Sequence, residues 1–358
     1  MRDIWYLVLP LIISALITPV VKQIGYRLDA FAQMNERTVH HGKIVRIGGV
    51  AIYLAFIITM ALYVKTDMAM NGILIGSTIM FIGGLVDDLV NLKPLYKFSF
   101  QVVAAIVLIA SGVTLDVIRL PLGITINMGV VSFIVTFFWI TGITNAVNLI
   151  DGLDGLCGGI SVIILTVIAM LAVIEGRGDV EMIALILVGA TLGFLIYNAH
   201  PASIFMGDCG ALFLGFIISA ISLLGFKSST IMTLALPLLL LALPIIDTLS
   251  AILRRTLKGH KFSEADKSHI HHLLMNKFGH KNTVIIMCIV TALFGLTAYV
   301  YMINKGIGLI SLFVIMLAVD LFIEGSGMIS DKYHPILSVS RRIIRRLTRK
   351  KTITDSDR

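Results

Sequence analysis

Asparagine and aspartate residues recur at three-residue spacing in one short segment of the chain. Asn145, Asn148, Asp151 and Asp154 follow one another in TNAVNLIDGLDGL. On a continuous helix this spacing forms a single polar stripe, although Gly152 favours a helix end or a turn within it. Either arrangement presents hard oxygen ligands, which Mg²⁺ takes from proteins together with substrate phosphates. The segment therefore predicts a cation site suited to phosphate chemistry.

A second polar segment, GGLVDDLVNLKPLYK, contains Asp87, Asp88, Asn91 and Lys97. Adjacent side chains on a helix diverge by about 100°, so the two aspartates need not face one site. Carboxylates at a membrane boundary are costly unless they meet water, a cation or a basic group. Lys97 could supply that group, or bind phosphate as a point charge.

Two further segments complete the set. In FMGDCG, Asp208 stands between glycines that allow close approach of the backbone, and Phe205 either packs in the core or stacks on a base. His269, His271 and His272 cluster in a loop rich in lysine and arginine. They lack the i, i+4 spacing typical of zinc-binding histidines on a helix. Their surroundings suit an anionic phosphate better than a cation.

The composition identifies the kind of molecule that must position these residues. Of 358 residues, 57% are hydrophobic and only 14% are charged, whereas soluble domains average about 45–50% and about 25%. This excludes a soluble globular enzyme, a disordered chain and a collagen-like fibre. Three cysteines without a CxxC pair favour neither disulfides nor zinc. A polytopic helical membrane protein remains, because helices satisfy their own backbone in lipid.

Eleven apolar segments are long enough to suggest spans, so we predict an all-α protein with about 11 transmembrane helices. The segments cover roughly 4–24, 47–64, 71–86, 98–114, 128–146, 158–174, 181–198, 211–226, 230–252, 283–302 and 307–323. The first is read as a retained span rather than a cleaved signal. The chain is expected to form one transmembrane domain, 1–325, followed by a basic tail, 326–358.

Basic residues predict the orientation of these spans. Of the 29 Lys and Arg residues, 23 fall on one side if the spans alternate, and cytoplasmic loops carry such an excess. The formal net charge of +8 is explained in the same way, without nucleic acid. We therefore expect the N-terminus outside the cell and the C-terminal tail in the cytoplasm. The cytoplasmic loops are 22–46, 87–97, 145–157, 198–210 and 253–282, which together hold all the polar motifs.

These motifs, in this order, resemble those of the polyprenyl-phosphate N-acetylhexosamine-1-phosphate transferases. The resemblance covers about residues 20–325 and rests on NAVNLIDGLDGL, FMGDCGALFLG and DKSHIHHLL together with the double aspartate. HIHH in place of three consecutive histidines resembles the TagO/WecA branch, whereas the MraY branch usually shows HHH. A departure is VRIGG, in which Val45 replaces the proline that is common in related sequences.

The resemblance implies a reaction. The phosphate of undecaprenyl phosphate attacks the β-phosphorus of UDP-N-acetylglucosamine, UMP leaves, and undecaprenyl-diphospho-N-acetylglucosamine stays in the bilayer. That product is the first lipid-linked intermediate of a cell-wall or surface glycan, with teichoic acid as the leading candidate. The implied partners are UDP-GlcNAc, undecaprenyl phosphate and membrane lipid, without nucleic acid. The sequence leaves open whether the protein forms a homodimer.

The resemblance also implies roles for single residues. Asp208 and Asp154 would bind Mg²⁺, for which Mn²⁺ could substitute, with Asp151 nearby. Asp87 or Asp88 would orient or deprotonate the lipid phosphate. His269, His271 and His272 would be catalytic residues and, with Lys97, would hold phosphate oxygens. Substrate contacts would also come from Phe205 stacked on uracil, and from Asn91, Asn145 and Asn148.

Two alternatives remain at this point. One is a different donor within the same chemistry, either UDP-MurNAc-pentapeptide or another UDP-sugar. The other is an ion-coupled transporter, in which intramembrane acids relay ions. Transporters place such groups near the midplane and often show inverted repeats, whereas the acids of this chain cluster at span ends.

Overall fold

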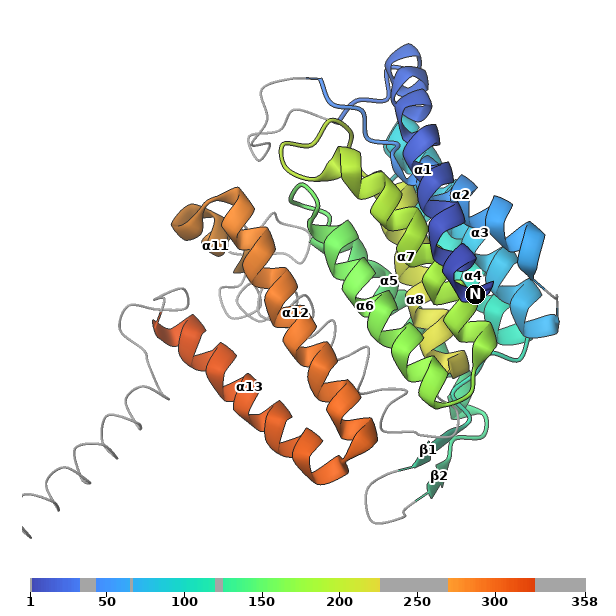
Figure 1. Ribbon diagram of the computed structural model, residues 1–358. Coiled ribbons are helices and arrows are strands. Elements are labelled where there is room, and N and C mark those ends of the chain that lie inside the picture. The colour runs from blue at the N-terminus through green and yellow to red at the C-terminus, as the bar shows by residue number, and fades with distance from the viewer. Residues whose placement is uncertain (1, 33–42, 65–66, 120–124, 226–269, 326–358) are drawn as a thin grey trace, which may run out of the picture.

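The computed structural model describes residues 2–32, 43–64, 67–119, 125–225 and 270–325 as a bundle of helices (Figure 1). Its first half contains α1 (Arg2–Arg27), α2 (Gly49–Tyr63), α3 (Met68–Val90), α4 (Pro94–Ala110) and α5 (Val131–Ile150). The second half contains α6 (Leu156–Ile174), α7 (Gly178–Asn198), α8 (Gly207–Gly225), α11 (Ile270–Phe278), α12 (His280–Ile303) and α13 (Lys305–Gly325).

Ten of the eleven predicted apolar segments coincide with a helix, and the remaining one, 230–252, lies outside the described residues. Among the described helices, seven are long and apolar enough to cross a membrane, and three shorter apolar ones accompany them. The prediction of a helical, multi-pass membrane protein is confirmed at this level. A helix satisfies the backbone groups of its interior by its own hydrogen bonds, so it can cross lipid, where no water is present to bind them.

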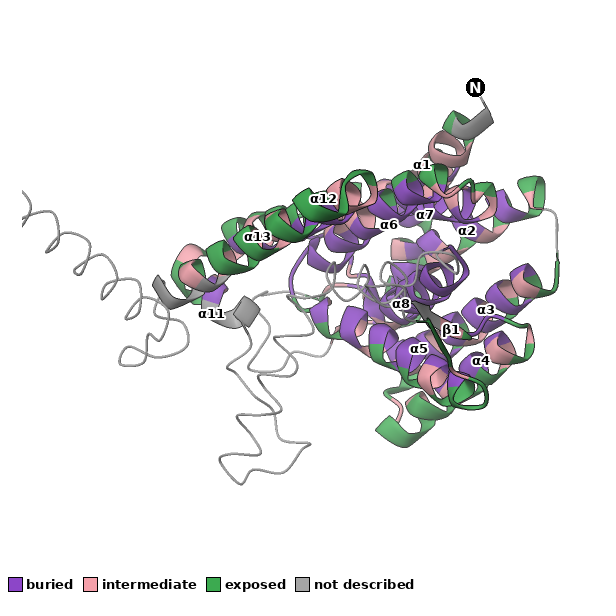
Figure 2. Ribbon diagram, turned by 90° about the horizontal axis from the view of Figure 1, so that it is seen from below, coloured by how far each residue is buried: buried purple, intermediate pink, exposed green. Residues whose placement is uncertain are grey.

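Helix α8 lies at the centre of the bundle and is buried along almost its whole length (Figure 2). α3 and α5 pack against it, and α2, α6 and α7 also contact it. At Gly84 of α3, a β-carbon would meet the backbone of Asp208 and Cys209. The missing side chain therefore lets α3 lie directly against the start of α8, which fixes where Asp208 stands.

Helices α12 and α13 form an antiparallel pair beside the main bundle (Figure 1). α12 packs against α6, and α13 packs against α12. The start of α12 lies at the same end of the bundle as the α5–α6 and α7–α8 connections (Figure 1). This end therefore gathers chain segments that are more than a hundred residues apart.

Hydroxyl side chains inside the spans bond to their own helices. Thr18, Thr59, Thr144 and Thr291 each donate to the carbonyl four residues earlier, at 2.6 to 2.9 Å. This is how a buried hydroxyl satisfies its donor without a partner on another helix. The bundle can therefore hold these polar residues without a water-filled interior.

The helices extend beyond the apolar segments that predict them. α3 continues through Asp87 and Asp88 to Val90, and α5 continues through Asn145 and Asn148 to Ile150. Apolar composition ends where a span meets polar surroundings, but helical hydrogen bonding continues until a residue breaks it. Asn91 ends α3 with a left-handed conformation, φ 50°, which asparagine tolerates better than most residues.

A short antiparallel hairpin departs from the all-α prediction. β1 (Val117–Arg119) pairs with β2 (Thr125–Asn127) between α4 and α5. Both strands are rich in β-branched residues, which favour extended backbone. The hairpin lies at the opposite end of the bundle from the polar motifs (Figure 1).

Candidate active site

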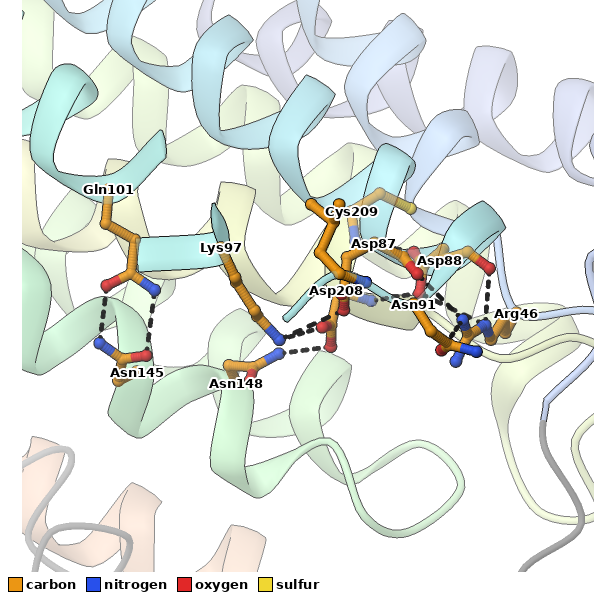
Figure 3. Close-up of polar contacts among 11 residues, drawn as sticks. Arg46, Asp87, Asp88, Asn91, Lys97, Gln101, Asn145, Asn148, Asp208 and Cys209 are labelled. Atoms are coloured by element: carbon orange, nitrogen blue, oxygen red, sulfur yellow. Dashed lines mark hydrogen bonds and ion pairs between the residues drawn. The ribbon is translucent and has the colours of Figure 1, made fainter. Parts of the chain in front are cut away.

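Helices α3, α4, α5 and α8 bring acidic and amide side chains together at one end of the bundle (Figure 3). α3 reaches this end with Asp87 and Asp88 in its last turn, and α8 begins there with Asp208 in its first. A three-residue connection, 91–93, turns the chain into α4, whose first turn carries Lys97. The short connection forces Lys97 back towards the acids.

Asp208 is held from two neighbouring helices. The Lys97 ammonium contacts its Oδ2, and Asn148 Nδ2 donates to its Oδ1 at 2.8 Å. Lys97 Nζ also lies 3.5 Å from Asp87 Oδ2. Two carboxylates therefore share one ammonium, which leaves this small region with excess negative charge (Figure 3).

Asp88 has a different environment from Asp87. Its Oδ1 accepts the backbone N–H of Asp208 at 3.0 Å, and its Oδ2 accepts that of Cys209 at 2.9 Å. The first N–H groups of a helix have no partner within it, and a carboxylate there is favourable. Asp88 therefore caps α8 from another helix and, being 4% exposed, positions Asp208 rather than facing the surface.

Asp87 faces the pocket instead. Its Oδ1 accepts the backbone N–H of Leu92 at 2.8 Å, and its Oδ2 faces Lys97. The pocket, about 470 Å³ in volume, lies between the ends of α3, α4 and α5. It is lined by polar residues and by Leu92, Pro94 and Phe98, so it offers both charge and apolar surface.

Asp151 joins this group of acids from the α5–α6 connection. Its carboxylate accepts a backbone hydrogen bond from Gly207. Burial, followed by the negative charges of Asp208 and Asp88, raises the pKa of Asp151 from 3.8 to about 8. Carboxylates so crowded repel one another, and a bound cation would relieve that repulsion.

Arg46 is a functional candidate to which the sequence assigned no role, although it lies in VRIGG. Its Nε donates to the carbonyl of Asp88 at 2.8 Å, and one terminal nitrogen donates to the carbonyl of Asp87 at 3.0 Å. The same nitrogen donates to Asn91 Oδ1 at 2.7 Å. Arg46 thus binds the unpaired end of α3, where a cation is favourable. Nothing local in the sequence indicates partners more than 40 residues away.

The backbone of the VRIGG segment also forms hydrogen bonds with the backbone of Phe205. Phe205 N donates to the carbonyl of Val45 at 2.8 Å, and its own carbonyl accepts Gly48 N at 2.9 Å. At Gly207, with φ +74°, a β-carbon would collide with the carbonyl oxygen of Arg46. Phe205 is therefore fixed three residues before Asp208 and is half-buried. Its predicted contact with uracil stays a prediction.

Asp154 lies with two histidines that the motif analysis did not select. His200 Nδ1 lies 2.9 Å from Asp154 Oδ2, which also accepts the backbone N–H of Ala202 at 3.0 Å. Asp154 N donates to His280 Nε2 at 3.1 Å. These bonds join the α5–α6 connection, the α7–α8 connection and the start of α12.

The two imidazole rings stack on each other. The ring centroids of His200 and His280 lie 4.1 Å apart, with 22° between the planes. One ligand atom from each of Asp154, His200 and His280 lies within 4.8 Å of the others, and imidazole and carboxylate are also metal ligands. Hydrogen bonds within the group join the connections to one another. Whether Asp154 also binds a cation stays a prediction.

The predicted histidine motif falls where the structure is not described in full. His269 lies outside the described residues, and His271 and His272 belong to α11 with side chains outside the description. α11 leads directly into α12 through Gly279. The roles predicted for these three histidines remain proposals.

The donor set at the Asp208 end of the bundle suits Mg²⁺. Within the described residues, the side chains that surround Asp208 offer carboxylate and amide oxygens from Asp87, Asp151 and Asn148. Hard oxygen ligands are those preferred by Mg²⁺ and Mn²⁺. The buried thiol of Cys209 points its hydrogen to the carbonyl of Met206 and is not part of this set.

Comparison with known proteins identifies the family. Residues 70–226 match the family model described as "Glycosyl transferase family 4", which includes the helices that carry the acids. The chain is 37% identical to a probable undecaprenyl-phosphate N-acetylglucosaminyl 1-phosphate transferase of Bacillus subtilis, over 95% of this chain and 96% of that protein.

More distant relatives carry related names. A decaprenyl-phosphate N-acetylglucosaminephosphotransferase of Mycobacterium tuberculosis is 32% identical over 78% of this chain and 76% of its own length. A phospho-N-acetylmuramoyl-pentapeptide-transferase of Streptococcus uberis is 30% identical over 63% and 74%. Since a relative is matched along nearly its whole length, the resemblance seen in the motifs is confirmed, and the chain belongs to glycosyl transferase family 4.

Proposed function

We propose that this protein transfers N-acetylglucosamine-1-phosphate from UDP-GlcNAc to undecaprenyl phosphate. The products are UMP and undecaprenyl-diphospho-N-acetylglucosamine. The observation that carries this choice of donor and acceptor is the near-full-length match to the Bacillus subtilis relative. The cluster of Lys97, Asn148 and Asp208 beside an amphipathic pocket supports the chemistry.

The reaction is phosphoryl transfer. An oxygen of the lipid phosphate forms a bond to the β-phosphorus of the donor, and the bond from that phosphorus to the bridging oxygen breaks, so UMP leaves with the electron pair. Phosphoryl transfer depends on alignment and on neutralisation of charge. A phosphate monoester is largely dianionic near neutral pH, because its second pKa is about 6, so the attacking oxygen does not require a protein base.

The chain supplies alignment and charge at the reacting phosphates. Lys97 places an ammonium beside Asp87 and Asp208, where it can move from carboxylate to phosphate oxygens. Asp88 and Arg46 fix the ends of α8 and α3 that carry these groups. The apolar side of the pocket, with Leu92 and Phe98, suits the first isoprene units of a lipid acceptor.

Mg²⁺ is the proposed cofactor, with Mn²⁺ as a substitute. Asp208, Asp151 and Asp87 would hold it with the amide oxygen of Asn148, and Asp154 stays a further candidate ligand. When bound, the cation neutralises charge on the diphosphate and stabilises the departing UMP. The crowding of carboxylates at Asp151 supports a cation there.

Removal of divalent cations is expected to abolish transfer. A cluster of carboxylates without enough positive charge would repel a diphosphate. Purified protein treated with EDTA should lose activity, and Mg²⁺ or Mn²⁺ should restore it, while Ca²⁺, which prefers more ligands and longer distances, should restore less. Full activity in rigorously metal-free buffer would exclude the proposed cofactor.

We also propose that the site faces the cytoplasm of a bacterial cell. The positive-inside bias of the loops supports this orientation, and the donor, a nucleotide sugar, is cytosolic. In a background without Cys157, Cys209 and Cys288, cysteines can be placed at Lys93 beside the site and at Thr125 in the hairpin, both exposed.

The orientation predicts opposite labelling of these two positions. In intact cells an impermeant thiol reagent should label Thr125→Cys and spare Lys93→Cys, which should react only after the membrane is opened. The two variants serve as controls for each other. Labelling of Lys93→Cys alone in intact cells would reverse the proposed topology.

A donor competition distinguishes the proposed function from its alternatives. UDP-GlcNAc, UDP-GalNAc and UDP-MurNAc-pentapeptide are offered together to purified protein with undecaprenyl phosphate, and the lipid products are resolved by mass. We expect the GlcNAc product to dominate. A muramoyl-pentapeptide product would favour the activity in the name of the Streptococcus relative, and no lipid product with any donor would favour a transporter.

A further inference from the structure

A pair of amide side chains joins α4 to α5 beside the Lys97–Asp208 contact (Figure 3). Gln101 Nε2 donates to Asn145 Oδ1 at 3.1 Å, and Asn145 Nδ2 donates to Gln101 Oε1 at 2.8 Å. Gln101 is 3% exposed, although both residues belong to the pocket wall. Two reciprocal hydrogen bonds fix the spacing and the register of two helices more closely than one bond.

The position of this pair relates it to the candidate active site. Lys97 and Gln101 are four residues apart on α4, and Asn145 and Asn148 are three apart on α5. Residues at these spacings lie on one face of a helix. Each helix therefore presents one amide to the pair and, one turn away, one side chain to Asp208.

Asn145 has no donor to spare for a substrate in this arrangement. Its Nδ2 also donates to the carbonyl of Thr141 at 2.8 Å, and a side-chain amide has only two N–H donors. Ionised phosphate oxygens accept hydrogen bonds but cannot donate them. A bond from Asn145 to a substrate phosphate would therefore break one of the two bonds that it makes here.

We propose that Gln101 and Asn145 are positioning residues, which set the register of α4 against α5 so that Lys97 and Asn148 reach the same carboxylate. Gln101 gains a role that its sequence context did not indicate, and Asn145, predicted from the sequence to bind substrate, acts through its neighbours. This inference rests on the proposed transfer reaction and adds a specific geometric requirement to it.

The pair can be tested by exchanging its two side chains. Gln101→Asn shortens one partner by a methylene and Asn145→Gln lengthens the other, so each single variant shifts the register. A misplacement of about 1 Å can cost about 10²-fold in rate. We expect each single variant to lower kcat by about 10- to 100-fold, while the KM for UDP-GlcNAc changes less than about threefold.

The double exchange restores the combined length of the two side chains. We expect Gln101→Asn/Asn145→Gln to recover kcat to within about fivefold of the original protein, because residues in contact show strongly non-additive effects. A double variant as slow as the slower single variant would overturn the proposal. So would an Asn145→Gln variant with unchanged kcat and a KM raised tenfold or more, which would indicate direct substrate binding.

Folding is controlled separately. Rates are expressed per folded molecule, from size-exclusion profiles and thermal unfolding in detergent. Ser99→Ala, which removes an exposed hydroxyl bonded to its own helix on α4, should leave kcat unchanged. If an exchange variant does not fold, Gln101→Met, Asn145→Leu and their combination give a second cycle with apolar side chains of similar shape.

The rates of Gln101→Met, Asn145→Leu and their combination are compared in the same way as those of the exchange variants. A coupled pair predicts that the combination is no slower than either single variant, whereas rate losses that multiply would show independent roles and contradict the proposal. The wild-type protein separates this inference from the function on which it rests. An inactive wild type contradicts both, and an active wild type with an unrescued exchange contradicts the positioning role alone.

Discussion

Asp208→Asn is expected to stop turnover almost completely while the protein still folds. The substitution keeps the shape of the side chain and its acceptor for Asn148, but it removes the charge that faces Lys97. Loss of one preorganised charge contact typically costs about 10²–10³ in rate, and loss of the bound cation should cost at least as much. The measurement is transfer rate per folded molecule across a range of Mg²⁺ concentrations.

The matched control is Asp67→Asn at the other end of the bundle. Asp67 caps α3 by accepting the backbone N–H of Met70 at 2.7 Å, and asparagine caps a helix about as well as aspartate. This variant should therefore retain activity and stability. Near-normal turnover of Asp208→Asn at ordinary Mg²⁺ would show that the cation site has been placed on the wrong residue.

Lys97→Met is expected to lower kcat/KM by at least about 10²-fold, since the ammonium is a preorganised charge in a partly buried position. It contacts Asp208 and lies 3.5 Å from Asp87, so its removal leaves two carboxylates facing each other and the incoming phosphates. Lys97→Arg keeps the charge but replaces a compact ammonium by a planar group, and it should fall between Lys97→Met and the original protein.

Lys93→Met provides the control for Lys97→Met. Lys93 precedes α4 and is exposed, so loss of its charge should change the rate less than about twofold, as for most surface substitutions. Equal losses in the two variants would mean that general positive charge at this end matters, rather than the contact of Lys97 with the acids. Activity as high in Lys97→Met as in the control would exclude the proposed role.

Hydropathy was sufficient to predict where ten of the described helices lie, because a long apolar segment can satisfy its own backbone in lipid as a helix. The local motifs also named acids at span ends, which are costly there without a partner, and the structure brings Asp87 and Asp208 together around Lys97. Neither hydropathy nor the motifs predicted the residues at which the helices end. The last turns of α3 and α5, which hold Asp87 and Asn148, are polar and remain helical because of backbone bonding that hydropathy does not report.

Long-range pairs account for most of what the sequence did not indicate. Arg46 donates hydrogen bonds to carbonyls more than 40 residues away in the sequence. Gln101 forms a hydrogen bond with Asn145, which lies 44 residues further along the chain. Such contacts depend on how helices pack, which a single sequence does not encode locally. His280 shows the same limit, because it reaches Asp154 across 126 residues, whereas the motif drew attention to His269.

The different contacts of Asp87 and Asp88 could also not be predicted without the folded structure. Their adjacency indicated only that the two side chains diverge. The structure turns Asp88 to the first N–H groups of α8 and Asp87 to Lys97 and the pocket. The two aspartates thus have different contacts, set by the helices that face them.

The most direct test of the central claim is the identity of the nucleotide released. Purified protein is incubated with Mg²⁺, undecaprenyl phosphate and UDP-GlcNAc labelled in its β-phosphate, and both the lipid and the nucleotide products are identified. Transfer of N-acetylglucosamine-1-phosphate predicts one UMP for each lipid product, with the labelled phosphate retained in the lipid. Release of UDP with no label in the lipid, or no lipid product at all, would contradict the proposed function.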